Sequence, residues 1–227
     1  MSKKLQGKIS ASMMCADLVH LKEDIELFEA MNIDFLHIDV MDGAFVPNYG
    51  LGVDYIRGLH ELTHIPLDIH LMVEKPEDKL SWFKIKPEDS VTIHYESTPN
   101  IQRALVKARA YDCSVRLAIN PGTPICLTEE LLRDIDGITL LTVNPGFAGQ
   151  KIVPGSFEKM EKLTNYLIQT GYEDMSVQVD GNISFNNAKQ LRICGADFFV
   201  AGTSSIFEVH NSKAMKQNIH LLREMIQ

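Results

Sequence analysis

The stretch "FLHIDVMDGAFVPN", residues 35–48, joins a buried strand to two polar side chains. Leu36, Ile38 and Val40 alternate with His37 and Asp39, and successive side chains of a strand point to opposite faces. One face therefore belongs to a hydrophobic core. The other must hold an imidazole and a carboxylate side by side, and an ionised carboxylate is buried only when it is paired or bound to a metal ion. The stretch predicts a strand that lies between a core and a functional site.

Short β-type runs and helix-like stretches alternate along the whole chain. We expect strands at residues 8–13, 34–41, 66–73, 90–94, 114–119, 137–143, 175–179 and 197–201. We expect helices at residues 17–31, 53–62, 76–85, 100–111, 126–135, 156–169, 185–194 and 213–226, the first with Asp17 as its N-cap. Strict alternation implies parallel strands joined by crossover helices. Eight such units predict an α/β fold of the (β/α)₈ TIM-barrel type, in a single domain over residues 1–227.

Composition and motifs exclude several other classes of protein. No G-x-G-x-x-G turn follows the first strand, as an open nucleotide-binding sheet would require. With a net charge of −8 and no basic run, the 227-residue chain is not expected to bind nucleic acid. No apolar run approaches the length of a membrane helix, and the N-terminal segment lacks the apolar part of a signal peptide. The four cysteines are scattered without a C-x-x-C pair, which indicates free thiols in a reducing compartment. We therefore expect a cytoplasmic protein without membrane association.

A (β/α)₈ barrel explains the polar face of residues 35–48. In this fold, inward side chains near the C-terminal strand ends form the active site, while outward ones pack against helices. The next strand repeats the pattern, because Asp68, His70 and Met72 share its inward face. Asp180 stands at the end of a later strand. Two imidazoles and two carboxylates that converge from three strands suit a divalent metal ion such as Zn²⁺, Mn²⁺, Fe²⁺ or Co²⁺.

Each of these residues also has a purely structural explanation. A single histidine on a strand is more often a hydrogen-bonded core residue than a ligand, and Asp42 and Asp180 each precede glycine, as turn aspartates do. His94, inward on the fourth strand, is undecided. The recurrence of His-x-Asp and Asp-x-His on neighbouring strands favours a site, with Met41 and Met72 as its apolar wall. We interpret the other histidines as surface or packing residues: His20, His60, His64, His210 and His220.

Glycine-rich segments follow the last three expected strands, at residues 144–150, 180–184 and 201–205. In barrels of this kind, a phosphate group commonly lies in the loops after strands seven and eight, at the N-terminus of a short helix. Glycine lets backbone N–H groups approach such an anion closely. Gly146, Gly149, Gly181 and Gly202 are the candidates. Each loop taken singly could be an ordinary βα turn, but three on one side of the barrel indicate a phosphate site.

Four motifs together resemble the ribulose-phosphate 3-epimerase family over essentially the whole chain: "HIDVMDGAFVPN", "LDIHLMVEKPED", "NPGFAGQ" and "VAGTSSIF". The resemblance implies a metal-dependent (β/α)₈ epimerase that acts at C3 of a phosphorylated ketose and forms a homo-oligomer. It implies one divalent metal ion, which we expect to be zinc in the protein as isolated. The implied metal ligands are His37, Asp39, His70 and Asp180, and the two aspartates are also the implied acid–base pair. The implied substrate-binding residues are Ser12, Met41, His70, Met72, Gly146, Phe147, Ala148, Gly149, Gly181, Asn182, Gly202, Thr203 and Ser204.

The chemistry of epimerisation agrees with this pair of aspartates. Inverting C3 requires removal of the proton next to the C2 carbonyl and return of a proton to the opposite face. One base can perform only half of this, whereas Asp39 and Asp180, on different strands, supply one acid and one base. A divalent ion would stabilise the negative charge of the enediolate. No redox cofactor is needed.

Several positions depart from the ribulose-phosphate pattern. Leu141 stands where the family often has a methionine, Asn182 where it usually has a glycine, and "GTSS" and "SMMC" replace commoner sequences. These features are similar to the D-allulose-6-phosphate 3-epimerase branch, so we expect the pair D-allulose 6-phosphate and D-fructose 6-phosphate. The alternative pair is D-ribulose 5-phosphate and D-xylulose 5-phosphate.

Two more distant alternatives stay open. Decarboxylases and aldolases share this barrel, but they would favour a lysine on an inward strand position. Lys75 and Lys151 follow a strand and a loop instead. A non-catalytic sugar-phosphate binder is the remaining alternative, although it would need neither a metal site nor an acid–base pair.

Overall fold

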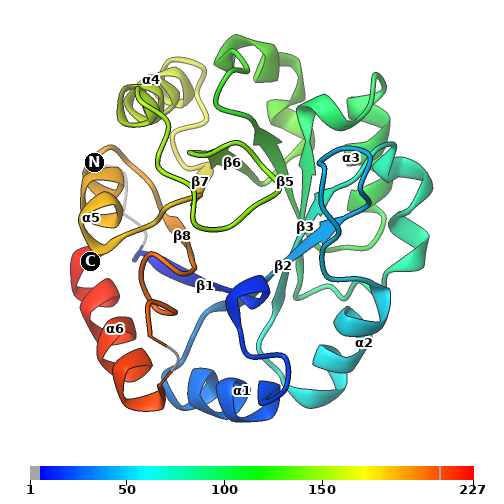
Figure 1. The fold of residues 1–227 in the computed structure, drawn as a ribbon. Coiled ribbons are helices and arrows are strands. Elements are labelled where there is room, and N and C mark those ends of the chain that lie inside the picture. The colour runs from blue at the N-terminus through cyan, green and yellow to red at the C-terminus, as the bar shows by residue number, and fades with distance from the viewer. Residues whose placement is uncertain (1–5, 210) are drawn as a thin grey trace.

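The computed structural model describes residues 6–209 and 211–227 as a closed barrel of parallel strands, with helices on its outside (Figure 1). Consecutive strands pair with one another, and β8 pairs with β1, which closes the barrel. The fold predicted from the sequence is therefore confirmed. The strands are β1 (Lys8–Ser12), β2 (Phe35–Met41), β3 (Leu67–Met72), β4 (Ser90–His94), β5 (Ser114–Ile119), β6 (Gly137–Leu141), β7 (Ser176–Asp180) and β8 (Phe198–Ala201).

Strand alternation separates the core from the barrel interior, as the first stretch predicted. On β2, the side chains of Leu36 and Ile38 are fully buried in the hydrophobic core that the helices cover. His37 and Asp39 lie on the other face. The register of β2 against β3 pairs His37 with Asp68 and Asp39 with His70, so the polar positions of the two strands are direct neighbours. This register brings two imidazoles and two carboxylates together before any loop contributes.

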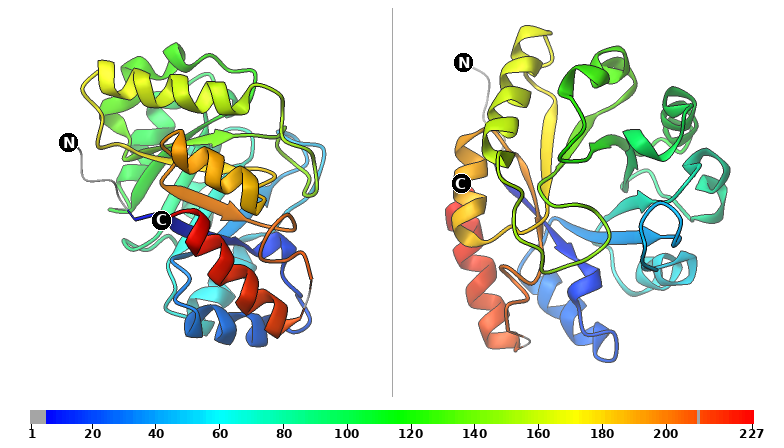
Figure 2. Two further views of the ribbon diagram at one scale, coloured as in Figure 1. Left: turned by 90° about the vertical axis from the view of Figure 1, so that its left-hand side faces the viewer. Right: turned by 45° about the horizontal axis from the view of Figure 1, so that its top comes forward.

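Six α-helices surround the barrel in the described part of the chain. They are α1 (Leu21–Ala30), α2 (Val53–Leu62), α3 (Ile101–Arg109), α4 (Ser156–Gln169), α5 (Phe185–Ile193) and α6 (Ser212–Met225). Figure 2 shows α4, α5 and α6 packed side by side along one flank of the barrel. None of the helices in residues 6–209 and 211–227 is long and apolar enough to cross a membrane.

Two of the expected helices are wrong in type. Residues 76–85 form two short 3₁₀ helices, Pro76–Asp78 and Leu80–Trp82, and residues 126–135 fall largely within a third, Ile125–Asp134. In the first segment, each bonded N–H reaches back three residues, as from Lys79 to the Pro76 carbonyl. In the second, the hydroxyl of Thr128 donates to the carbonyl of Ile125 at 2.9 Å, which competes with regular helical bonding.

Smaller differences concern helix and strand ends. Asp17 is not the N-cap of α1, which begins only at Leu21; its carboxylate instead accepts from the N–H of Val19 and bonds to the exposed His20 ring. Strand β6 ends at Leu141, and β7 continues to Asp180, so that Asp180 is the last residue of its strand. Of the other expected features, the N-terminal residues 1–5 and His210 lie outside the described residues.

Candidate active site and metal centre

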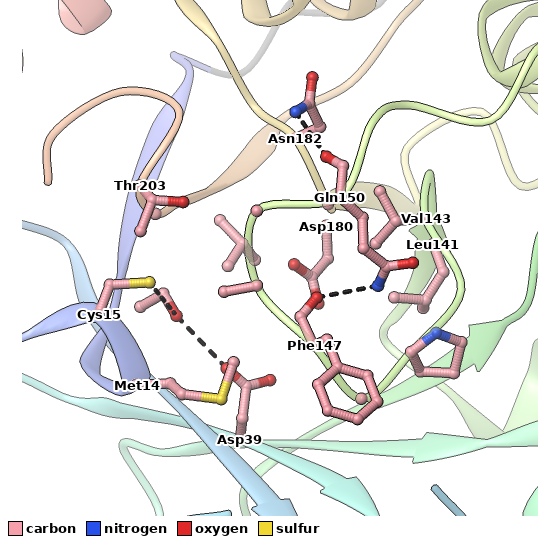
Figure 3. Close-up of a pocket in the computed structure, with 18 of the residues that line it drawn as sticks. Met14, Cys15, Asp39, Leu141, Val143, Phe147, Gln150, Asp180, Asn182 and Thr203 are labelled. Atoms are coloured by element: carbon pink, nitrogen blue, oxygen red, sulfur yellow. Dashed lines mark hydrogen bonds between the residues drawn. The ribbon is translucent and has the colours of Figure 1, made fainter. Parts of the chain in front are cut away.

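A pocket that is partly open to solvent lies at the C-terminal end of the barrel strands. The loop after β6, residues 142–155, runs across this end (Figure 1). Asp39 and Asp180 both point into the pocket (Figure 3). His37 and His70 are fully buried beneath it. The predicted substrate-binding residues that line the pocket are Ser12, Met41, Met72, Gly146, Phe147, Ala148, Gly149, Gly181, Asn182, Gly202, Thr203 and Ser204.

Four side chains at the floor of the pocket each direct one donor atom toward a common point. Nε2 of His37 lies 3.2 Å from Oδ1 of Asp39 and 3.7 Å from Oδ2 of Asp180. Nδ1 of His70 lies 3.3 Å and 3.4 Å from the same two oxygens. All four donor atoms lie within 4.8 Å of one another. The structure therefore brings together the four ligands that the family resemblance implied.

The spacing of these donors fits a small divalent ion. Imidazole nitrogens and carboxylate oxygens bind zinc at about 2.0–2.2 Å. Donors at the corners of a tetrahedron of that size are about 3.3–3.6 Å apart. The four nitrogen–oxygen separations, 3.2, 3.7, 3.3 and 3.4 Å, match that edge length. Two neutral imidazoles and two carboxylates also supply the net charge of −2 that balances a divalent cation.

Asp68 orients His37 toward this centre. One oxygen of Asp68 accepts from Nδ1 of His37 at 2.7 Å, from the hydroxyl of Ser10 at 2.9 Å and from the amide of Gln178 at 2.5 Å. With its proton on Nδ1, His37 presents the lone pair of Nε2 to the other ligands. Asp68 was recognised from the sequence as inward-facing, but its role depends on this contact. It supports a ligand and lies outside the four-ligand set.

The charges of the centre are strongly coupled. Burial raises the pKa of Asp39, but the charge and hydrogen bonds of His37 and the hydrogen bond of His70 outweigh it, so that this pKa lies well below its ordinary value. Burial lowers the pKa of His37, yet the carboxylates of Asp39 and Asp68 raise it well above the ordinary value. Asp39 also accepts from the hydroxyl of Ser12 at 3.3 Å. The centre thus favours ionised carboxylates with positive charge between them.

Two residues of β4 and its following turn extend the centre. His94 is fully buried, and its Nε2 lies 2.8 Å from Nε2 of His70. Its Nδ1 lies 3.3 Å from Oε2 of Glu96. Burial lowers the pKa of His94 to about 4. Sequence periodicity placed His94 on the inward face but could not assign a partner, and Glu96 gave no signal because it lies beyond the strand.

Two residues that follow β7 have positive φ angles. Gly181 has φ of 112°, and a Cβ there would lie 2.5 Å from Cγ2 of Val143, so only glycine fits. Asn182 follows with φ of 50°, a left-handed conformation that asparagine tolerates better than most residues. Its side-chain amide donates to the carbonyl of Gln150 at 2.7 Å and to the hydroxyl of Ser204 at 3.2 Å. Asn182 therefore ties the loops after β6, β7 and β8 together.

The chain after β8 differs from the sequence expectation. Among the described residues after Gly202, positions 203–207 form turns without a short helix, and the next described helix is α6, which begins at Ser212. The N–H groups of Ser205 and Phe207 donate to the carbonyl of Gly202. Thr203 and Ser204 line the pocket. Any anion contact here comes from turn backbone and hydroxyl groups, without a helix terminus.

Sulfur-containing side chains form one wall of the pocket. Met41 and Met72 pack with Val46 in a small apolar cluster, and Met14 packs against it. Met14, which was not predicted from the sequence, thus supplies a third thioether, while Leu141 lines the pocket at the position where the family often has methionine. The other lining residues that were not predicted are Cys15, Val143, Asn144, Pro145, Gln150, Ile183 and Val200.

The remaining candidates have structural roles. Asp42 is a turn aspartate: its carboxylate accepts from the backbone N–H groups of Ala44, Phe45 and Glu74, and it also forms an ion pair with Lys79 at 2.6 Å. His60, interpreted as a surface or packing residue, packs at the far side of the strands. There its Nε2 lies 3.0 Å from Asp89. His64 and His220 are exposed.

Fold and site together define a class: a (β/α)₈ barrel whose mouth holds a His₂Asp₂ centre beside glycine-rich loops. Residues 8–207 match the model of the ribulose-phosphate 3-epimerase family. The chain belongs to this family. Membership makes it a carbohydrate-phosphate 3-epimerase, an isomerase.

Individual members of the family align with this chain over nearly their whole length. The chain is 35% identical to ribulose-phosphate 3-epimerase of Methanocaldococcus jannaschii, with 93% of this chain and 89% of the relative covered. It is 31% identical to the Bacillus subtilis enzyme of the same name, with 92% and 97% covered. It is 34% identical to the Escherichia coli enzyme, with 89% and 90% covered.

Solved structures of lower sequence identity share the fold alone. The 3-hexulose-6-phosphate synthase of Salmonella typhimurium superposes with a TM-score of 0.65 at 12% identity, covering 96% of this chain and 98% of that one. The orotidine 5'-phosphate decarboxylase of Pyrococcus horikoshii gives 0.63 at 15% identity, with 96% and 98% covered.

Proposed function

We propose that this protein interconverts phosphorylated ketoses that are epimeric at C3, by proton transfer between two aspartates in the presence of one divalent metal ion. The observation that supports this most directly is the placement of Asp39 and Asp180. Each extends from a different strand into the same pocket, and each has an oxygen within 3.4 Å of Nδ1 of His70.

In this mechanism, one aspartate removes the proton from C3 and the other returns a proton to the opposite face. The double bond then lies between C2 and C3, and the two adjacent oxygens share the negative charge. When bound, the divalent ion supplies positive charge that stabilises those oxygens. His37, Asp39, His70 and Asp180 would hold it. The thioethers of Met14, Met41 and Met72 keep this end of the pocket apolar and limit the access of water.

The phosphate group would bind at the other end of the pocket. Gly146, Gly181 and Gly202 open the backbone there, and the hydroxyls of Thr203 and Ser204 supply further donors. Gly146 has φ of 116° and Gly181 has φ of 112°, which lets their loops turn their N–H groups toward a ligand. The net charge of −8 provides no long-range attraction for a phosphate, so binding depends on these local donors.

For the substrate, the named relatives favour D-ribulose 5-phosphate, with D-xylulose 5-phosphate as its product. The comparisons lend no support to the six-carbon preference expected from Leu141, Asn182 and the "SMMC" stretch. D-Allulose 6-phosphate is therefore the second candidate. We also propose that the protein is cytoplasmic, forms a homo-oligomer and carries zinc as isolated. The donor set equally suits Mn²⁺, Fe²⁺ or Co²⁺.

A decarboxylase or aldolase is the less favoured alternative on this barrel. Among the described residues that line the pocket, none is a lysine, whereas Lys75 lines a separate surface hollow and Lys151 is exposed. A non-catalytic sugar-phosphate binder would have no use for two ionisable carboxylates placed beside one imidazole.

The test is isotope exchange at C3. Metal-loaded protein is incubated in D₂O with ribulose 5-phosphate and, separately, with allulose 6-phosphate, and NMR follows both deuterium incorporation and the epimer formed. Deuterium at C3 together with the epimer is the expected result, and the ratio of the two rates identifies the preferred substrate. Protein that holds its metal but exchanges neither sugar would refute the proposed function.

A further inference from the structure

Three side chains form a hydrogen-bonded chain that runs outward from the proposed metal centre: the buried imidazoles of His70 and His94, and the partly exposed carboxylate of Glu96. Nε2 of His70 faces Nε2 of His94 at 2.8 Å, and Nδ1 of His94 faces Oε2 of Glu96 at 3.3 Å. The planes of the two imidazoles differ by only 20°, with ring centroids 4.9 Å apart. Because the facing nitrogens are much closer than the centroids, the rings meet edge to edge. This is the geometry of an in-plane hydrogen bond between two imidazoles.

Such a bond requires one proton between the two nitrogens, and the direction of donation determines the tautomer of His70. If His70 donates from Nε2, its Nδ1 carries a lone pair. If His94 donates instead, a neutral His70 carries its proton on Nδ1, directly between Asp39 and Asp180. Only the first arrangement leaves Nδ1 able to bind a metal ion.

Glu96 selects the first arrangement. An ionised carboxylate can only accept hydrogen bonds, so Nδ1 of His94 must carry the proton that it shares with Glu96. A neutral His94 then has its lone pair on Nε2, and His70 must donate to it. Burial raises the pKa of Glu96, but hydrogen bonds from His94, Thr123 and Asn120 lower it to about 2. Glu96 is therefore ionised at neutral pH.

The position of Glu96 is itself fixed by a turn from another part of the barrel. Its second oxygen accepts from the N–H of Asn120 at 2.9 Å and from the hydroxyl of Thr123. Lys159, on α4, holds this turn by donating to the carbonyls of Asn120 at 2.8 Å, Pro121 at 3.0 Å and Thr123 at 2.7 Å. The carboxylate cannot easily turn away from His94.

We propose that His94 and Glu96 are positioning residues, which fix the tautomer and ring orientation of His70 so that its Nδ1 faces the metal ion. This inference rests on the metal centre of the proposed function. The two histidine ligands are then oriented in different ways. Asp68 acts on His37 directly, whereas Glu96 acts on His70 through a second imidazole.

The experiment compares variants of the full chain by metal affinity and by the tautomer of His70. His94→Phe keeps an aromatic ring but removes the acceptor, whereas His94→Gln restores an acceptor oxygen. Glu96→Gln keeps the shape of Glu96 but can donate as well as accept. Zinc affinity is measured by competition with a chromophoric chelator, and ¹⁵N chemical shifts of the His70 ring report its tautomer with and without zinc. His60→Phe, in the buried pair with Asp89 remote from the pocket, is the matched control.

We expect His94→Phe to weaken zinc binding about 10- to 100-fold, as loss of an orienting partner typically does. His94→Gln should recover most of that loss, Glu96→Gln should lie between the two, and His60→Phe should leave zinc binding unchanged. In the wild type, the proton of His70 should be on Nε2. Wild-type zinc affinity in both His94→Phe and Glu96→Gln would overturn the inference, as would a neutral, zinc-free wild-type His70 that carries its proton on Nδ1.

Two further outcomes keep the inference separate from the proposed function. If His94→Phe does not fold, Glu96→Gln and the wild-type ¹⁵N shifts decide the question. If the wild type binds no divalent ion at all, the metal centre of the proposed function fails, and this inference fails with it. If zinc binds normally but is indifferent to His94 and Glu96, only the inference fails.

Discussion

One carboxylate oxygen of Asp39 and one of Asp180 lie 3.3 and 3.4 Å from the same ring nitrogen, Nδ1 of His70. They come from β2 and β7, two strands that do not pair with each other. Their environments differ, since the side chain of Asp39 is 7% exposed and that of Asp180 is 17% exposed. The more exposed Asp180 can be altered with less effect on the fold.

Replacing Asp180 should separate catalysis from folding. Asp180→Asn keeps the shape of the side chain but cannot exchange a proton with C3. We expect kcat to fall about 10²- to 10⁴-fold, the usual contribution of a general acid or base. The melting temperature should change little, because the backbone carbonyl that accepts from the N–H of Thr142 is untouched. Turnover and C3 exchange in D₂O measure the effect, and turnover close to wild type would contradict the two-aspartate mechanism.

Removing one imidazole should empty the metal centre. His70→Ala deletes a nitrogen that lies within 3.4 Å of both aspartates. We expect the metal content after dialysis to fall from about one ion per chain to a small fraction of that. Elemental analysis provides the measurement, and His64→Ala, at an exposed loop histidine, serves as the control with unchanged metal content. A normal stoichiometry in His70→Ala would remove His70 from the ligand set.

Glu96 should contribute stability that depends on pH. Its pKa in the folded protein is about 2, below the ordinary value of 4.5, so its ionised form stabilises the fold above pH 4.5. That contribution is lost as the pH falls from 4.5 toward 2. We expect Glu96→Gln to lower the free energy of unfolding by about 1 kcal/mol at pH 7, because solvent screens this partly exposed carboxylate, and by less at pH 3.5. Denaturant titrations of both proteins at the two pH values test this; a difference independent of pH would be inconsistent with it.

A methyl group at Gly181 should disturb the loops that we propose to bind the phosphate group. Gly181→Ala places a Cβ 2.5 Å from Cγ2 of Val143, on a backbone with φ of 112°. We expect a loss of about 1–3 kcal/mol in the free energy of unfolding, together with a higher KM. Gly122→Ala is the matched control, because a Cβ there meets nothing within 4 Å. If the two variants unfold at the same denaturant concentration, Gly181 is not the restricted position that its φ indicates.

The sequence by itself determined the barrel fold and the face of β2 that bears the polar side chains. Strict alternation of strands and helices leaves few architectures, and the two-residue period of a strand assigns His37 and Asp39 to one face and Leu36 and Ile38 to the other. These are local properties, encoded in neighbouring residues. For the same reason, the bounds of the strands were predicted to within two residues.

Hydrophobic periodicity alone did not distinguish an α-helix from a 3₁₀ helix. Residues 76–85 and 126–135 have helical periodicity, yet both segments form 3₁₀ helices; in the second, the hydroxyl of Thr128 bonds to the backbone carbonyl of Ile125. The left-handed Asn182 is a departure from the family pattern in the sequence. In the structure its side chain joins three loops, through Gln150 and Ser204.

Only the tertiary structure decided which polar residues meet. The register of β2 against β3 sets Asp39 beside His70, and closure of the barrel brings Asp180 to the same nitrogen. Asp68, His94 and Glu96 acquire their roles through side-chain hydrogen bonds to residues far away in the sequence. Such bonds depend on strand register and on the positions of whole loops. A sequence pattern gives the face on which a side chain lies, whereas the partner across the barrel follows from how the entire sheet closes.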